Sequence, residues 1–141
     1  MSQENVELFR QSIDAYNRRD LDALLALMDE DVESIPRTSG LEGESSYRGH
    51  DGVRRWWNNL LDVFPDFSIK AVEEIRGVGD LTFSPIRLSG RGAGSTAPTD
   101  QAFWLVNRWR RGKCIWWRTF DTRADALEAA GLSERDAHAD S

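Results

Sequence analysis

The residues best suited to chemistry lie near the C-terminus, where a tryptophan-rich segment ends in an acid. Trp104, Trp109, Trp116 and Trp117 precede Asp121 in two apolar runs. A carboxylate buried among aromatic rings has its pKa raised by desolvation, which suits a general base. Asp121 is therefore the candidate catalytic residue. It could instead cap the helix that follows it, a role that aspartate commonly fills.

The two apolar runs are predicted to form a β-hairpin that turns at Arg111-Gly112. A two-residue turn places Val106 opposite Trp117, Trp104 opposite Thr119 and Ala102 opposite Asp121, on a face that would line a cavity. The outer face would carry Leu105, Trp109, Trp116 and Arg118. Aromatic residues and arginine are enriched at interfaces, so Trp109, Trp116 and Arg118 mark a predicted homodimer face. A bulge or a longer turn would reverse the assignment of Arg118.

A set of large side chains could bind a small apolar, ring-containing molecule, because such side chains supply apolar area with few rotamers. The predicted substrate-binding residues are Tyr16, Trp56, Trp57, Leu60, Trp104, Val106, Trp117 and Thr119. Each could equally be an ordinary core residue. If the tryptophans fill the space completely, the chain would be a structural dimerisation module.

Composition limits the other classes of function. The chain has 141 residues, enough for one domain over residues 1–132, with a flexible polar tail at 133–141. A net charge of −6 argues against nucleic-acid binding. One cysteine and two histidines form no metal-ligand pattern, and the glycine-rich segment 89–95 lacks the lysine of a phosphate loop. We therefore expect no metal and no cofactor. No signal or membrane-spanning segment is evident, so we expect a cytoplasmic protein.

The elements that would position these residues follow an α+β order. Apolar periodicity predicts helices at Gln3–Arg18, from an Asp20 N-cap to Met28, and from His50 or Asp51 to Pro65. Strands are expected at Val32–Ile35, Phe67–Ile75 and Leu81–Leu88, before the hairpin. Pro85 indicates an edge position or a bulge. Thr122-Arg123-Ala124-Asp125 has the form of a helix cap, so a short helix is expected after Thr122. A loop at Arg37–Ser46 that could close over a pocket completes the prediction.

Several segments in this order resemble SnoaL-like polyketide cyclases and ketosteroid isomerase-like proteins of the nuclear transport factor 2-like superfamily. They are Ala15-Tyr16-Asn17-Arg18-Arg19-Asp20-Leu21-Asp22-Ala23-Leu24, Asp31-Val32-Glu33, Tyr47-Arg48-Gly49-His50-Asp51-Gly52-Val53, Gly79-Asp80, Arg111-Gly112-Lys113 and Arg123-Ala124-Asp125-Ala126-Leu127-Glu128-Ala129-Ala130-Gly131-Leu132. The resemblance implies a cone-shaped fold in which a curved, mixed, mostly antiparallel sheet packs on N-terminal helices. It also implies an internal pocket and frequent homodimers.

The isomerase mechanism does not carry over with the fold. The position of its general-base aspartate falls at or near Pro36, its oxyanion-hole tyrosine at about Ser12, and its protonated acid near Trp104 or Leu105. A steroid isomerase needs these groups to move a proton and stabilise an enolate. Two functions therefore stand: a cofactor-independent isomerase, cyclase or hydrolase that uses Asp121, and a non-catalytic ligand-binding or dimeric interaction domain.

Overall fold

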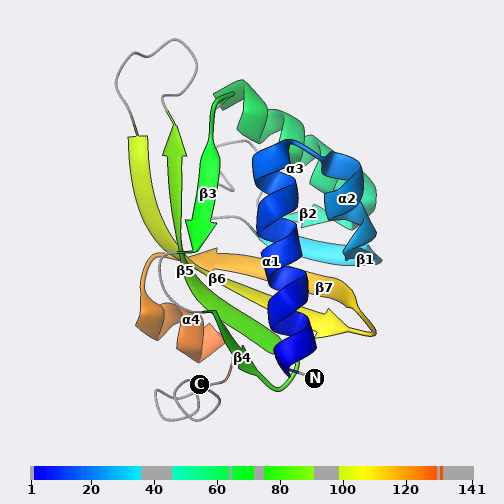
Figure 1. Cartoon of the computed structure of the whole chain (residues 1–141), viewed down its shortest axis with the longest axis vertical. Coiled ribbons are helices and arrows are strands. Elements are labelled where there is room, and N and C mark those ends of the chain that lie inside the picture. Colours follow the sequence, from blue (N-terminus) through cyan, green and yellow to red (C-terminus); the bar gives the residue numbers. More distant parts are fainter. Residues whose placement is uncertain are drawn as a thin grey trace.

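The computed structural model describes residues 2–35, 46–63, 65–71, 75–90, 99–129 and 131. These residues form four helices: α1 (Ser2–Arg18), α2 (Leu21–Ala26), α3 (Gly49–Val63) and α4 (Arg123–Ala129). Helices α1, α2 and α3 gather together, whereas α4 lies apart from them beside β5 and β6 (Figure 1). The predicted loop Arg37–Ser46, except Ser46, and the tail 133–141 lie outside the described residues.

The strands form one curled sheet that does not close. They are β1 (Met28–Ile35), β2 (Tyr47–Arg48), β3 (Ser68–Ala71), β4 (Arg76–Val78), β5 (Leu81–Gly90), β6 (Thr99–Arg110) and β7 (Lys113–Phe120). Their order is β2-β1-β7-β6-β5-β3, with β4 also pairing with β5. Only the β1–β7 pair is parallel among these described strands. The predicted α+β class and the mixed, mostly antiparallel sheet are therefore confirmed.

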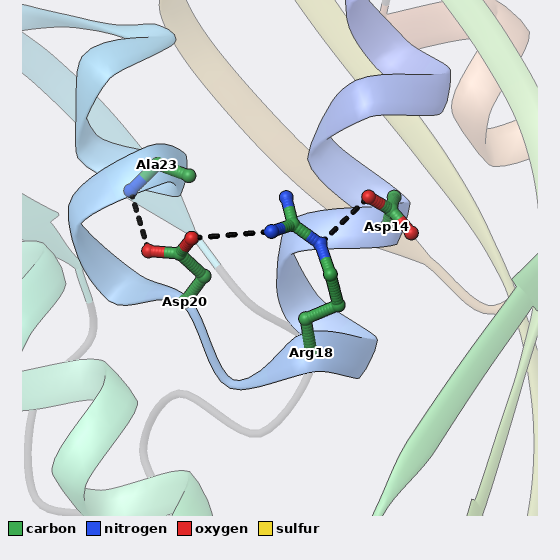
Figure 2. Close-up of polar contacts among 4 residues, drawn as sticks. All are labelled: Asp14, Arg18, Asp20 and Ala23. Carbon is green, nitrogen blue, oxygen red and sulfur yellow. Dashed lines mark hydrogen bonds and ion pairs between the residues drawn. The ribbon is translucent and has the colours of Figure 1, made fainter.

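The corner between α1 and α2 forms as the sequence indicates. Asp20 is the N-cap of α2, and its Oδ1 accepts a hydrogen bond of 3.0 Å from the backbone N–H of Ala23. Arg18 bridges Asp20 and Asp14, with N···O distances of 3.2 and 2.7 Å (Figure 2). The bridging side chains are exposed, so the cap contributes more to stability than the ion pairs do.

Pro85 lies on a strand inside the sheet, not at its edge. Strand β5 has β6 on one side and both β3 and β4 on the other. Strand β3 pairs with residues 86–89 of β5, and β4 pairs with residues 81–83. Among the described residues, Pro85 therefore lies between the part of β5 that pairs with β3 and the part that pairs with β4, so its missing N–H interrupts neither pairing.

The terminal hairpin turns where predicted, but its faces differ. Arg111 and Gly112 both have positive φ values, 53° and 78°, and Arg110 pairs with Lys113. Beyond the turn, Trp109 pairs with Cys114 but Arg108 pairs with Trp116, so Ile115 is an extra residue in β7. This β-bulge shifts the predicted register by one residue.

The shift corrects the predicted partners of Trp117, Thr119 and Val106. Asn107 is the residue opposite Trp117, Leu105 is opposite Thr119, and Val106 is opposite Arg118. Trp104 and Val106 consequently lie on the face opposite to that of Trp117 and Thr119. In antiparallel pairs, directly opposed residues share a face, and alternate residues change face.

Two cores occupy the two faces of the sheet. The larger core packs the inner face against α1, α2 and α3, and it includes Phe9, Trp56, Trp57 and Trp117. The smaller core lies on the outer face under α4. Its buried residues are Leu81, Phe83, Val106, Ala126 and Leu127, with Trp104, Trp116 and Phe120 packed against them. Helix α4 begins after Thr122, whose Oγ1 accepts a hydrogen bond from the N–H of Asp125, which confirms the predicted cap.

Asn17 joins α1 to the edge strand β3. Its side-chain amide donates to the carbonyl of Ile69 and accepts from the N–H of the same residue, both at 2.8 Å. These two bonds occupy backbone groups of Ile69 on a strand that ends the sheet order. Asn17 therefore acts as a substitute for a neighbouring strand at this position.

Replacing Asn17 with alanine should lower the free energy of unfolding by about 1–3 kcal/mol, because two backbone groups of β3 lose their partner. Urea denaturation would measure the change. Asn58→Ala is the matched control, since Asn58 is an exposed asparagine on α3, and it should change stability by no more than about 0.5 kcal/mol. Equal effects of the two substitutions would contradict the role of Asn17.

Candidate functional site

A small cavity lies inside the cone, between the helices and the inner face of the sheet. Its volume is about 10 Å³, roughly the space that one water molecule needs. Helix α1 contributes Ser12 and Tyr16, and the α2–β1 segment contributes Leu24, Leu27 and Met28. The sheet contributes Leu105, Asn107, Trp109, Cys114 and Trp117. The bulge at Ile115 is what brings Trp117 and Asn107 to the same wall.

An aromatic cluster stands beside the cavity and fills much of the cone. The ring centroids of Tyr16 and Trp57 are 5.9 Å apart in a stacked arrangement. Trp56 meets Trp117 edge-on at 5.0 Å and Tyr16 at 5.6 Å. Tyr16, Trp56, Trp57 and Trp117 therefore come together as predicted, and Leu60 is buried in the same core. Such contacts hold the rings in fixed orientations.

Besides Thr119 Oγ1, three polar groups on the inner face are buried without a hydrogen-bond partner among the described residues. They belong to one cross-strand row, in which Ser34 of β1 pairs with Trp117 of β7, and Trp117 pairs with Asn107 of β6. The groups are Ser34 Oγ, Trp117 Nε1 and Asn107 Oδ1. Leaving a buried polar group unpaired costs about 1–3 kcal/mol. Trp117 and Asn107 of this row line the cavity.

Two ionisable groups on the cavity wall stay neutral near pH 7. Burial raises the pKa of the Cys114 thiol to about 12, and the hydrogen bond from the Asn107 amide offsets this only in part. Burial also raises the pKa of Tyr16, and the nearby Cys114 thiolate would raise it further. Neither group can act as a base at neutral pH. Among the described residues that line the cavity, none has a carboxyl, imidazole, amine or guanidinium group.

The remaining predicted site residues lie elsewhere. Asp121 is exposed at the end of β7, so it is not buried among tryptophans as its predicted pKa shift requires. Trp104 and Val106 lie on the outer face, where the ring centroids of Trp104 and Phe83 are 4.9 Å apart. Thr119 lies on the inner face opposite Leu105, and its Oγ1 is buried without a partner.

The predicted dimer face also changes. Trp109 is 3% exposed in the inner core, and its Nε1 donates to Thr82 Oγ1 at 2.9 Å, so it is wrongly assigned to the outer face. Trp116 and Arg118 do lie outside, and the Arg118 and Arg108 guanidinium carbons stand 5.3 and 5.5 Å from the Trp116 ring centroid. Leu105 faces inward with Trp109.

The cavity contains residues that the sequence did not indicate as binding residues. Asn107 lies between Leu105 and Trp109, which both face inward. A polar residue within this apolar alternation is the sequence feature that could have identified Asn107 as a cavity residue. The resemblance places the isomerase tyrosine at about Ser12 and the acid near Trp104 or Leu105. Ser12 and Leu105 line the cavity, whereas Trp104 lies on the outer face. Ser12 Oγ donates to the carbonyl of Phe9 at 2.6 Å, so its hydroxyl proton is already engaged.

Two further findings concern metals and membranes. Within the described ranges, no three histidine, cysteine, aspartate or glutamate side chains gather as metal ligands would. In the same part of the chain, no helix is both long enough and apolar enough to span a membrane. The expectations of no metal and of a cytoplasmic location stay predictions.

The buried thiol generates a prediction about alkaline pH. The thiol pKa is about 12 in the folded chain and 9.0 for an unperturbed thiol, so the folded state keeps a proton that the unfolded state loses. The contribution of the Cys114 thiol to the free energy of unfolding is fully present below pH 9 and falls as the pH rises toward 12. The slope is about 1.4 kcal/mol per pH unit. Urea denaturation across this range should show a steeper fall for the wild type than for Cys114→Ala. Parallel pH profiles would contradict the assignment.

Comparison with known proteins places the fold in a family. The model of the SnoaL-like domain matches residues 9–118, and no curated protein matches the chain. An NTF2-like protein of unknown function from Burkholderia pseudomallei K96243 has a TM-score of 0.76 at 19% identity, over 96% of this chain and 98% of that one. TerC, co-crystallised with polyporic acid, has a TM-score of 0.71 at 20% identity, over 89% and 96%.

A third structure is a ketosteroid isomerase-like protein from Catenulispora acidiphila DSM 44928 in complex with trimethylamine. Its TM-score is 0.71 at 14% identity, over 90% of this chain and 94% of that one. At such identities the structural likeness establishes the fold alone. The family model covers most of the chain, from α1 into β7. The chain therefore belongs to the SnoaL-like domain family and has the nuclear transport factor 2-like fold.

Proposed function

We propose that this chain is a non-catalytic binding domain for one small, uncharged, largely apolar molecule in the cone. The observation that carries the proposal is the neutral wall of the cavity. Its described lining residues have no carboxyl, imidazole, amine or guanidinium group, and the pKa values of Cys114 and Tyr16 are both raised. Such a wall can exclude water and hold an apolar ligand, but it offers no group for proton transfer at neutral pH.

The cavity has room for about one water molecule, so even a single-ring ligand requires it to change shape. At about 10 Å³ the cavity must widen before it admits an organic molecule. Met28 and Leu27 on its wall have unbranched or singly branched aliphatic side chains, and methionine adapts readily to different shapes. Tyr16 and Trp117 are held by ring contacts. We therefore expect widening on the α2–β1 side.

The alternative function is an isomerase or cyclase that uses Asp121 as its base. A general base must lie within hydrogen-bond reach of the proton that it removes. Asp121 is exposed and is not among the residues that line the cavity, so this mechanism stays a prediction with less support. Homodimerisation through the outer face also stays a prediction, now with Trp116 and Arg118 but without Trp109.

Toluene provides a direct test of the binding function. At a concentration about ten times its dissociation constant, it should raise the melting temperature by about 3–5 °C, because it binds only the folded state. Ser12→Leu fills the cavity from α1 and should abolish this shift. Gln11→Leu is the matched control, because Gln11 is the exposed neighbour of Ser12 on the same helix, and the shift should persist.

Circular dichroism would confirm that both variants are folded. Leu105→Phe, on the sheet wall of the cavity, is a second filling variant in case Ser12→Leu is unstable. Native mass spectrometry of the purified wild type would also detect a retained ligand and report the oligomeric state. No shift in the wild type, or an equal shift in the filled variants, would refute the proposal.

A further inference from the structure

The unpaired polar row on the inner face points to the chemical class of the ligand. Trp117 and Asn107 are 3% and 6% exposed, they are directly opposed across β7 and β6, and both line the cavity. Within the described part of the chain, Trp117 Nε1 is a donor without an acceptor, and Asn107 Oδ1 is an acceptor without a donor. Buried polar groups in native proteins are nearly always paired, so this complementary pair calls for a partner.

Several polar groups near Trp117 Nε1 and Asn107 Oδ1 already make hydrogen bonds within the protein. Asn107 Nδ2 donates to Cys114 Sγ at 3.5 Å, and Trp109 Nε1 donates to Thr82 Oγ1. The Cys114 thiol donates to the carbonyl of Trp116 at 3.2 Å. The Trp117 ring is held by Trp56, so its N–H cannot readily turn to another acceptor. Trp117 Nε1 and Asn107 Oδ1 are therefore one donor and one acceptor at this wall that no described hydrogen bond occupies.

We infer that the cone selects an uncharged, single-ring molecule that carries a hydroxyl group, which accepts a hydrogen bond from Trp117 Nε1 and donates one to Asn107 Oδ1. A hydroxyl can accept and donate through one oxygen atom, whereas a carbonyl only accepts and an ammonium only donates. The wall has no cation to pair with a carboxylate ligand among its described residues, and an unpaired buried charge is costly. This inference rests on the proposed binding function.

Phenol, toluene and benzoate separate the possibilities, because they share one ring and differ in one substituent. An apolar cavity would prefer toluene, since phenol loses its hydrogen bonds with water on entry. A cavity with both partners in place should bind phenol about tenfold more tightly than toluene. Benzoate should not bind measurably at neutral pH. Isothermal titration calorimetry with the wild-type protein would give the three dissociation constants.

Two substitutions test the assigned partners. Asn107→Leu removes the acceptor and Trp117→Phe removes the donor, and each should reduce the preference for phenol to about twofold or less. Trp116→Phe is the matched control, because it removes an indole N–H from the adjacent residue on the outer face, and the preference should persist. Trp117→Phe keeps an aromatic ring, so it serves if Asn107→Leu does not fold.

The outcomes distinguish this inference from the function on which it rests. Equal binding of toluene and phenol by the wild type would overturn the hydroxyl assignment and leave the binding function intact. Tighter binding of benzoate, or a phenol preference that survives both Asn107→Leu and Trp117→Phe, would also overturn the assignment. Binding of none of the three compounds would refute the binding function and this inference together.

Discussion

One extra residue in β7 decides which chemistry faces the interior of this protein. Without Ile115, the turn at Arg111-Gly112 would place Trp117 opposite Val106; with it, Trp117 lies opposite Asn107. Because side chains alternate between faces, a shift of one residue exchanges the whole set on one strand. Strand β1 has its own irregularity at the same level, between Met28 and Glu33, where it pairs with β7. Bulges increase local twist, so the two irregularities also contribute to the curl of the sheet.

The exchange of faces creates two separate apolar environments. The inner environment holds Trp109 and Trp117 under the three N-terminal helices, and the outer environment holds Trp104 and Trp116 beside α4. Trp116 and Trp117 are neighbours in the sequence but belong to different cores. On the outer side the arginines 108, 118 and 123 lie over aromatic rings. On the inner side the described cavity wall is neutral. Arg108 and Arg118 of the hairpin thus lie on the face away from the cavity.

Local signals were sufficient to predict most elements. The caps at Asp20 and Thr122 and the turn at Arg111-Gly112 depend on neighbouring backbone groups, and all three are confirmed. The aromatic cluster was also predictable, because Trp56 and Trp57 lie on the apolar face of α3. The bulge was not predictable, since Ile115 has no local feature that distinguishes a bulged residue from a paired one. The faces of Trp104, Val106 and Trp109 were therefore wrong, as was the edge position of Pro85, which depends on where two distant strands end.

The cavity wall also includes residues at or near which the family resemblance places isomerase catalytic groups. They are Ser12 and Leu105, the latter being one of two candidates for the acid position. Ser12 donates to its own helix, and Leu105 has no polar group, so neither can stabilise a developing enolate. The buried polar groups without a described partner on this wall belong instead to the paired residues Trp117 and Asn107. Both groups are neutral at every pH at which the protein is folded. Under the proposed binding function, these two groups orient the ligand through hydrogen bonds, and neither can take a proton from it.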